Sequence, residues 1–276
     1  MSAHEIQKEK RDGETVIGIK RMNFNWIGVA SFAKREYDRT IRVAGQVFVS
    51  PWISSFLFIF IFGSVLGQRI DLIGGVPYIN FVFPGILAMN VIQGAFMSSS
   101  SVLYFSRFLH SIEEILVAPF SYFEMILSFA LSAVIRTVII AIGIMLIGFF
   151  FGAVYFSHPL TFFLVTFVVS TIFALFGMIV GLWANGFEQL NIVPTFIIMP
   201  LAFLGGMFYS IDMLPPSLQA VSHFNPFFYF VDLMRYSMID HHDTSLILSW
   251  TVTLASLVVL STLTWYLFKR GWRIRE

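Results

Sequence analysis

The sequence contains no cysteine, so it can form neither a disulfide nor a thiolate metal site. Charged residues make up only 12% of its 276 residues, about half of what a soluble domain carries. The sequence also lacks the motif G-x-x-x-x-G-K-[ST], whose loop cradles nucleotide phosphates. These absences exclude a disulfide-bonded secreted domain, an ordinary soluble enzyme and a P-loop ATPase.

Apolar residues dominate instead, since 57% of the chain is hydrophobic and 33 residues are phenylalanine. A helix needs roughly 20 apolar residues to cross a bilayer. Six stretches meet that length, at about 48–68, 80–104, 124–156, 160–184, 189–208 and 246–268. The expected fold is an all-α polytopic membrane protein with six transmembrane helices in a domain covering 48–276.

Basic residues are unevenly distributed. They are concentrated in the first 48 residues and recur at Arg107 and in the tail Lys269, Arg270, Arg273 and Arg275. With six spans both ends lie on one side, and the excess of Lys and Arg in short loops marks the cytoplasm. Both termini are therefore expected to be cytoplasmic, which leaves Arg69 and Arg235 on the outer side.

The N-terminal region divides into two parts. Residues 1–24 are polar and mixed in charge, and we expect a disordered cytoplasmic tail. In 25–47 apolar residues recur at three- and four-residue steps opposite Lys34, Arg35, Arg39 and Arg42, which predicts an amphipathic interface helix. This helix is either an anchor held by anionic lipid or an elbow that carries force into the first span.

A second short helix is expected at 106–119, between the second and third spans, where Pro119 stops the pattern. Its apolar residues suit docking into a groove on a soluble partner, and its glutamates would be repelled by an anionic leaflet. The alternative is an interfacial helix that touches only lipid. The candidate coupling residues are Arg107, Phe108, Ile112, Glu113, Glu114, Leu116 and Pro119.

The segment 205–240 is too apolar for an ordinary loop and too broken for a span, because Gly205-Gly206, Pro215-Pro216 and Pro226 interrupt any helix. Broken backbone at membrane depth is tolerated where protein buries it or where it lines a wet cavity. We expect a re-entrant helical hairpin on the outer side. Its candidate gate residues are Gly206, Tyr209, Asp212, Pro215, Pro216, Asn225, Pro226, Asp232 and Arg235.

These motifs resemble the membrane subunit of type-2 ATP-binding-cassette (ABC-2) exporters, the bacterial drug, lipid and glycan permeases. The resemblance rests on GMFYS at 206–210, Leu214-Pro215-Pro216, Asn225-Pro226-Phe227 and Asp232-x-x-Arg235, with VPYINFVFPGI at 76–86 and ANGFEQLN at 184–191. It implies a homodimer in the bacterial cytoplasmic membrane, joined to two separate ATPase subunits that bind the ATP and Mg. No cofactor is expected on this chain.

A substrate pathway needs polar groups inside the bundle. The second span supplies them near one helical face, at Asn90, Gln93, Met97, Ser100 and Ser101. Hydrogen bonding between helices is the open alternative. The glycine pairs Gly63/Gly67, Gly148/Gly152 and Gly177/Gly181 are spaced for close helix approach.

Other charged residues have structural interpretations. Arg136 interrupts the third span and either serves the pathway or extends its side chain to the headgroups at the inner boundary. Asp232 and Arg235, three residues apart, are expected to pair and clamp the hairpin, with Asp212 as a possible third member. The sequence His241-His242-Asp243 is expected to be a plain outer loop rather than a metal site.

Two other classes of function remain as alternatives. An ATP-independent channel or secondary carrier would place coupling-ion carboxylates within the spans, whereas only Glu124 and Glu188 lie near span ends. An intramembrane enzyme would need acids, histidines or metal ligands clustered at one depth, and the sequence shows no such cluster. The sequence therefore favours a permease and does not name its cargo.

Overall fold

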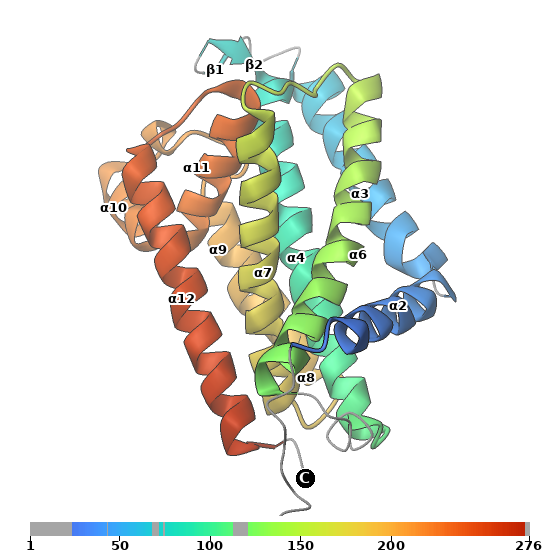
Figure 1. The fold of residues 1–276 in the computed structure, drawn as a ribbon. Helices are drawn as coiled ribbons and strands as arrows, with labels where there is room; N and C mark the ends of the chain where they lie inside the picture. The colour runs from blue at the N-terminus through green and yellow to red at the C-terminus, as the bar shows by residue number, and fades with distance from the viewer. Residues whose placement is uncertain (1–23, 43, 68–71, 74, 113–120, 274–276) are drawn as a thin grey trace, which may run out of the picture.

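The computed structural model describes residues 24–42, 44–67, 72–73, 75–112 and 121–273. Over these residues the chain is a helical bundle with one minimal β-hairpin at an end (Figure 1). The hairpin pairs β1 (Leu72–Ile73) with β2 (Val76–Pro77), antiparallel, with Leu72 opposite Pro77. Almost all of the predicted tail lies outside the described residues.

Five helices of the described chain are long and apolar enough to cross a membrane, which confirms the all-α polytopic class. The segment at 189–208 differs, because its helix covers only the 16 residues Gln189–Leu204. Such a helix rises about 24 Å, short of the roughly 30 Å hydrocarbon core. A sixth full span therefore stays a prediction. The five long helices are Gly45–Gly63, Tyr78–Phe108, Tyr122–Phe150, Pro159–Trp183 and Leu246–Arg270.

The first and fifth apolar segments contain π-helical turns. In the first, η2 (Gly45–Val49) and η3 (Ile61–Leu66) flank α3 (Ser50–Phe60). In the fifth, η4 (Pro194–Ile198) separates α8 (Gln189–Val193) from α9 (Met199–Leu204). Proline removes a backbone donor, so the change to wider turns at Pro194 has a local cause.

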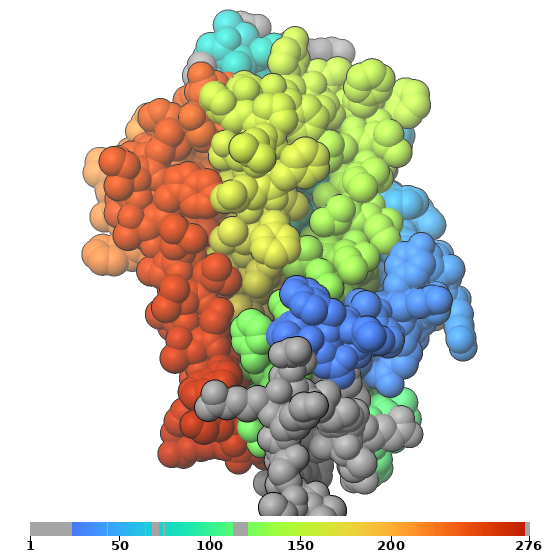
Figure 2. All heavy atoms as spheres, in the orientation of Figure 1, coloured from blue at the N-terminus to red at the C-terminus, as the bar shows by residue number. Residues whose placement is uncertain are grey.

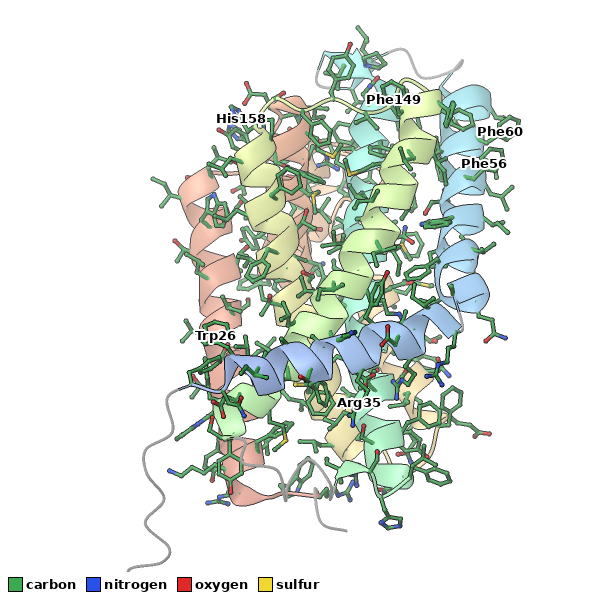
Figure 3. The ribbon with its side chains drawn as sticks, turned by 45° about the vertical axis from the view of Figure 1, so that its right-hand side comes forward. Trp26, Arg35, Phe56, Phe60, Phe149 and His158 are labelled. Carbon is green, nitrogen blue, oxygen red and sulfur yellow. The ribbon has the colours of Figure 1, made fainter. Side chains whose placement is uncertain are left out.

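The predicted amphipathic helix is α2 (Trp26–Arg42), which crosses the bundle low down and nearly at right angles to the long helices (Figure 3). Asn25 caps it by accepting a hydrogen bond from the Gly28 amide at 2.9 Å. The Glu124 carboxylate accepts from the Asn25 and Ser121 amides at 2.6 and 2.7 Å. One carboxylate thus joins the starts of α2 and of α6 (Tyr122–Phe150).

Helices α4 (Tyr78–Phe108) and α7 (Pro159–Trp183) form the centre of the bundle. They approach closely because Gly177 and Gly181 lie against the backbone of α4. A Cβ added at Gly177 would stand 2.5 Å from the Phe96 carbonyl oxygen, and one at Gly181 would stand 2.8 Å from that of Ser100. The predicted close approach at this glycine pair is confirmed, within one subunit.

The other two glycine pairs do not form such seams. Gly148 lies against the Phe83 ring, but Gly152 has open space and a φ of +65° that ends the helical region. Because α6 stops at Phe150, the span expected to reach residue 156 is shorter than predicted. Gly63 faces the Ile79 side chain, whereas Gly67 faces its own helix.

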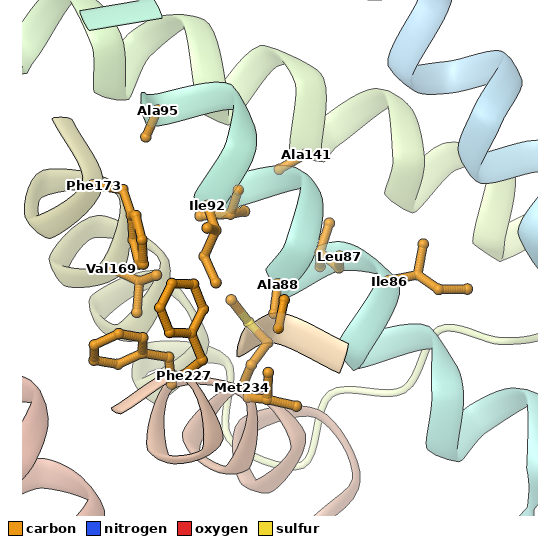
Figure 4. Close-up of a cluster of buried hydrophobic side chains, with 14 of the residues drawn as sticks. Ile86, Leu87, Ala88, Ile92, Ala95, Ala141, Val169, Phe173, Phe227 and Met234 are labelled. Atoms are coloured by element: carbon orange, nitrogen blue, oxygen red, sulfur yellow. The ribbon is translucent and has the colours of Figure 1, made fainter. Parts of the chain in front are cut away.

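The segment expected to form the outer hairpin folds as η5 (Ile211–Met213), α10 (Pro216–Phe224) and α11 (Pro226–Ile239). Its re-entrant course from the outer side stays a prediction. Helix α11 is buried along most of its length. Figure 4 shows its Phe227 and Met234 among Ala88 and Ile92 of α4 and the α7 side chains. The hairpin is therefore wedged into the bundle rather than laid over it.

Most of the fully buried side chains of helix α12 (Leu246–Arg270) are polar, and many of its apolar side chains are exposed. Its buried side chains are Ser249, Thr253, Thr264 and Phe268, whereas Ile247, Val258 and Val259 are exposed. It forms one broad edge of the molecular surface in Figure 2. This pattern suits a helix whose outer face meets lipid rather than water.

Candidate functional site

Arg235 is the centre of the hairpin formed by η5, α10 and α11, and its side chain is only 1% exposed. Its Nη1 lies 3.0 Å from the Asp243 Oδ2, and its Nη2 donates to the Gly206 carbonyl at 2.6 Å. The guanidinium also lies over the Phe81 ring of α4, 3.9 Å from the centroid. One side chain thus connects α11, the turn after α9, the segment before α12, and α4.

Asp243 and Asp232 complete this network, which we call the hairpin clamp: Arg235, Asp243, Asp232, Ser210, Ser249 and Gly206. The Asp243 carboxylate accepts from the Ser210 hydroxyl at 2.8 Å and lies 3.2 Å from the His241 Nε2. Asp232 accepts from the Asp243 amide at 2.6 Å and from the Ser249 hydroxyl at 2.8 Å. Every carboxylate oxygen therefore has a polar partner.

The predicted ion pair between Asp232 and Arg235 is wrong, because Arg235 pairs with Asp243 instead. Helix α11 ends at Asp240, which takes a left-handed conformation with φ +56°, and the chain folds back beside the helix. This return brings Asp243 to Arg235, while Asp232 faces α12. Asp212 is exposed on η5, and the segment expected to be a plain loop supplies the counter-ion instead.

The hairpin also closes the end of the short fifth helix. The last carbonyls of a helix lack partners within it. Here Leu201, Phe203 and Leu204 accept from Asn225 Nδ2, Tyr209 Oη and Ser222 Oγ at 2.6, 2.9 and 3.0 Å. Burial raises the pKa of the Tyr209 phenol, so it stays protonated as a donor.

Asn225 has a second role, because its side chain accepts from the Phe227 amide and caps α11. The prolines Pro216 and Pro226 occupy the first positions of α10 and α11, where the missing donor costs nothing. Pro215 precedes α10 in an extended conformation. The breaks seen in the sequence are thus the helix starts of the hairpin.

The candidate coupling residues begin at the opposite end, where α4 continues to Phe108 and the chain turns at His110 with φ +56°. Arg107 and Phe108 therefore form the last turn of α4 rather than the start of a separate helix. Ile112 is buried in a cluster with Phe32 and Leu103. Glu113, Glu114, Leu116 and Pro119 lie outside the described residues.

Arg107 holds the C-terminal end of α7. Its Nη1 lies 3.0, 2.8 and 3.2 Å from the carbonyl oxygens of Gly181, Leu182 and Ala184. From the other side, Arg273 donates to the Trp183 carbonyl. A cation at a helix C-terminus also offsets the helix dipole. The end of α7 is thus fastened both to α4, beside the coupling segment, and to the residues after α12.

We expect Arg107→Ala to lower the free energy of unfolding by about 1.5–3 kcal/mol, because charged hydrogen bonds to the α7 carbonyls are lost. The measurement is the thermal transition of the purified chain in one detergent, with amide exchange over 181–185. Lys269→Ala, which removes a surface cation from α12, is the matched control. Unchanged exchange in the Arg107 variant would contradict the capping role.

The pathway residues of α4 divide into two groups. Asn90, Gln93, Met97 and Ser101 are half-buried along one face, and the Asn90 amide donates to its own helix at Ile86. Ser100 is fully buried beside Gly181 of α7. The first group keeps the position expected of a lining face, whereas Ser100 belongs to the seam between α4 and α7.

The family model described as "ABC-2 type transporter" matches residues 29–239, which cover α2 through α11. The chain belongs to the ABC-2 type transporter family. The predicted family is thus confirmed, and the chain is a membrane transporter permease.

Relatives of this ABC-2 permease cover most of its length. It is 33% identical over 256 residues to the inner membrane transport permease YadH of Escherichia coli K12, covering 92% of this chain and all of the relative. It is 24% identical to Nodulation protein J of Rhizobium leguminosarum bv. trifolii, covering 83% and 87% of the two chains. A Sinorhizobium fredii Nodulation protein J is likewise 24% identical, covering 79% and 82%.

The sequence did not reveal two structural contacts. Glu124, noted only as a carboxylate near a span end, joins two helix starts, and its signal was the capping box with Ser121. Asp243 was missed because the chain turns back after α11 at the left-handed residue Asp240, and no local sequence pattern requires that turn. Groups of three or more metal-ligating side chains do not occur among the described residues.

Proposed function

We propose that this chain is the permease subunit of an ATP-driven exporter that moves a lipid-like, drug-like or glycan substrate outward across the bacterial inner membrane. It works as a homodimer with two cytoplasmic ABC ATPase subunits, which hold the ATP and Mg. Both termini face the cytoplasm. The half-buried face of α4 lines the substrate route, and the hairpin clamp holds the outer end shut.

The observation that carries this proposal is the end of α4. The helix has 31 residues and rises about 46 Å, well beyond the roughly 30 Å hydrocarbon core. In Figure 3 the ends of α4 and α12 extend past α2, the helix that suits the membrane surface. Phe108 and Leu109 are each 66% exposed there. Apolar side chains beyond the membrane surface favour a docked protein partner.

The engaged carboxylates of Glu124 and Asp232 weigh against a secondary carrier. Glu124 is engaged by the Asn25 and Ser121 amides, and Asp232 by Asp243 and Ser249. A coupling-ion site needs carboxylate oxygens free to take up and release the ion. In the part of the chain that the structure describes, these two buried carboxylates of the transmembrane domain are committed to structural hydrogen bonds.

The test uses the full chain with the ATPase subunit that co-purifies with it in mild detergent. We expect no ATP hydrolysis by the chain alone, hydrolysis by the assembly, and substantial loss of ATPase capture in the double variant Phe108→Asp/Leu109→Asp. Reversing Glu113 and Glu114 to lysine is expected to have the same effect. Glu188→Lys, an exposed charge reversal between α7 and α8, is the control.

Two outcomes would overturn the proposal. One is sustained ATP turnover by the isolated, uncontaminated chain. The other is undiminished ATPase capture and export activity in both docking variants, because the partner would then dock elsewhere or not at all.

A further inference from the structure

The junction of α2 and α6 carries more positive charge than its carboxylate can balance. Arg35 and Arg39 of α2 lie 3.7 and 3.1 Å from the two oxygens of Glu36, whose side chain is only 5% exposed. Arg136 of α6 lines one cavity together with Ala33, Tyr37 and Thr40 of α2, which lie within about one helical turn of Glu36. Two guanidinium groups thus share one carboxylate, and that of Arg136 lies at the neighbouring cavity.

Arg136 is the member of this group left without a partner. Its Nε is buried and has no hydrogen-bond partner among the described residues. Beside it is a small cavity of about 10 Å³, whose polar lining is Tyr37, Thr40, Ser132 and Arg136. That space holds about one water-sized oxygen. The Thr40 and Ser132 hydroxyls donate to carbonyls of their own helices, so the donors left for a phosphate are the Arg136 guanidinium and the Tyr37 hydroxyl.

The surroundings of the cavity indicate where the phosphate comes from. From Ile135 and Ile139 at its edge, an apolar stripe runs up α6 at three- and four-residue steps. Its members Ile142, Leu146 and Phe149 are 51, 60 and 74% exposed. A cationic group at the foot of an exposed apolar stripe matches a phospholipid, with its phosphate at the arginines and its acyl chains along the helix.

We propose that Arg39 and Arg136 bind the phosphate of an anionic phospholipid in the leaflet that α2 covers. One phosphate oxygen enters the cavity between Tyr37 and Arg136, and the half-exposed Arg39 closes over the others. The bound lipid supplies the negative charge that Glu36 alone does not. Under the proposed topology this is the inner leaflet, but the site itself depends on neither the cargo nor the direction of transport.

A bound lipid would combine the two roles of α2 that the sequence left open, an anchor held by anionic lipid and an elbow that carries force. Helix α2 is fastened to α6 at its start through Glu124, and the phosphate would fasten it again about three turns further on. The angle between α2 and the third span would then depend on the lipid bound there.

The experiment uses the full chain purified in a neutral detergent. Phosphatidylglycerol, phosphatidylcholine and inorganic phosphate are added separately, and bound lipid is counted by native mass spectrometry beside the thermal transition. We expect wild type to retain phosphatidylglycerol, and Arg136→Gln and Arg39→Gln each to bind it about fivefold more weakly or worse. Arg42→Gln removes the same charge from α2 at a residue that neither lines the cavity nor pairs with Glu36, and it should retain the lipid.

Each of these measurements can contradict the proposed lipid site. Equal retention of phosphatidylglycerol by wild type and both glutamine variants would overturn the site, as would equal loss in Arg42→Gln. Phosphatidylcholine bound as tightly as phosphatidylglycerol would show that net charge does not hold the lipid. If inorganic phosphate alone produced the same stabilisation, the assignment to a lipid would fall in favour of a soluble anion. Should Arg136→Gln fail to fold, the more exposed Arg39→Gln carries the test.

Discussion

Replacement of Arg235 by leucine is expected to destabilise the chain by about 3–5 kcal/mol, because it leaves Asp243 buried without its counter-ion. The Asp243 side chain is only 3% exposed, so water cannot compensate for the loss. The Gly206 carbonyl loses its 2.6 Å donor at the same time. The measurement is the thermal transition of the full chain in detergent, together with the fraction that elutes as a single species.

A double-mutant cycle separates the ion pair from lost packing. Arg235→Leu combined with Asp243→Asn removes both charges, and we expect it to recover part of the stability lost in Arg235→Leu alone. Asp212→Asn is the matched control, since this carboxylate is exposed on η5. No recovery in the double variant, or a loss of similar size in Asp212→Asn, would contradict the hairpin clamp as described.

The second large effect is expected at the seam between α4 and α7. In Gly177→Leu the new side chain meets the Phe96 carbonyl oxygen, since even a Cβ would stand 2.5 Å away. That neighbour is backbone and cannot rotate aside, so the two helices must separate. We expect little or no monodisperse protein from Gly177→Leu, and a loss of about 1–3 kcal/mol from Gly177→Ala.

A graded series checks the geometric cause. Gly181→Ala, with its nearest atom at 2.8 Å, should cost less than Gly177→Ala, and Gly45→Ala, with nothing within 4 Å, should cost least. The readout is size-exclusion profile and melting temperature in one detergent. Equal losses at all three positions would indicate helix-wide effects of the substitution rather than contact at the seam.

The sequence predicted those helices and contacts that depend on a local pattern of residues. The apolar and basic steps of 25–47 predicted the interface helix, which the structure has at Trp26–Arg42. The prolines at 216 and 226 predicted breaks, which in the structure are the starts of α10 and α11. The spacing of Gly177 and Gly181 indicated a close helix contact, which the structure places against α4. In each case the residues that carry the signal also make the contact.

Longer-range features could not be predicted in the same way. The counter-ion of Arg235 depends on where the chain returns after Asp240, and the role of Glu124 depends on α2 arriving beside α6. The length of the fifth helix was overestimated because hydropathy continues through Gly205-Gly206, whereas the backbone turns there with φ +75° at Gly206. These outcomes depend on packing between distant segments, which periodicity does not encode.

The exposed apolar side of α12 has a mechanical consequence. Lipid solvates its outward leucine, valine and isoleucine side chains as well as protein would, so moving this helix sideways in the bilayer exposes little that lipid cannot cover. Its buried hydrogen bond to the hairpin, from Ser249 to Asp232, is then a specific restraint on its upper end. An event that loosens the hairpin would free α12 to swing outward about the end held near α7 by Arg273.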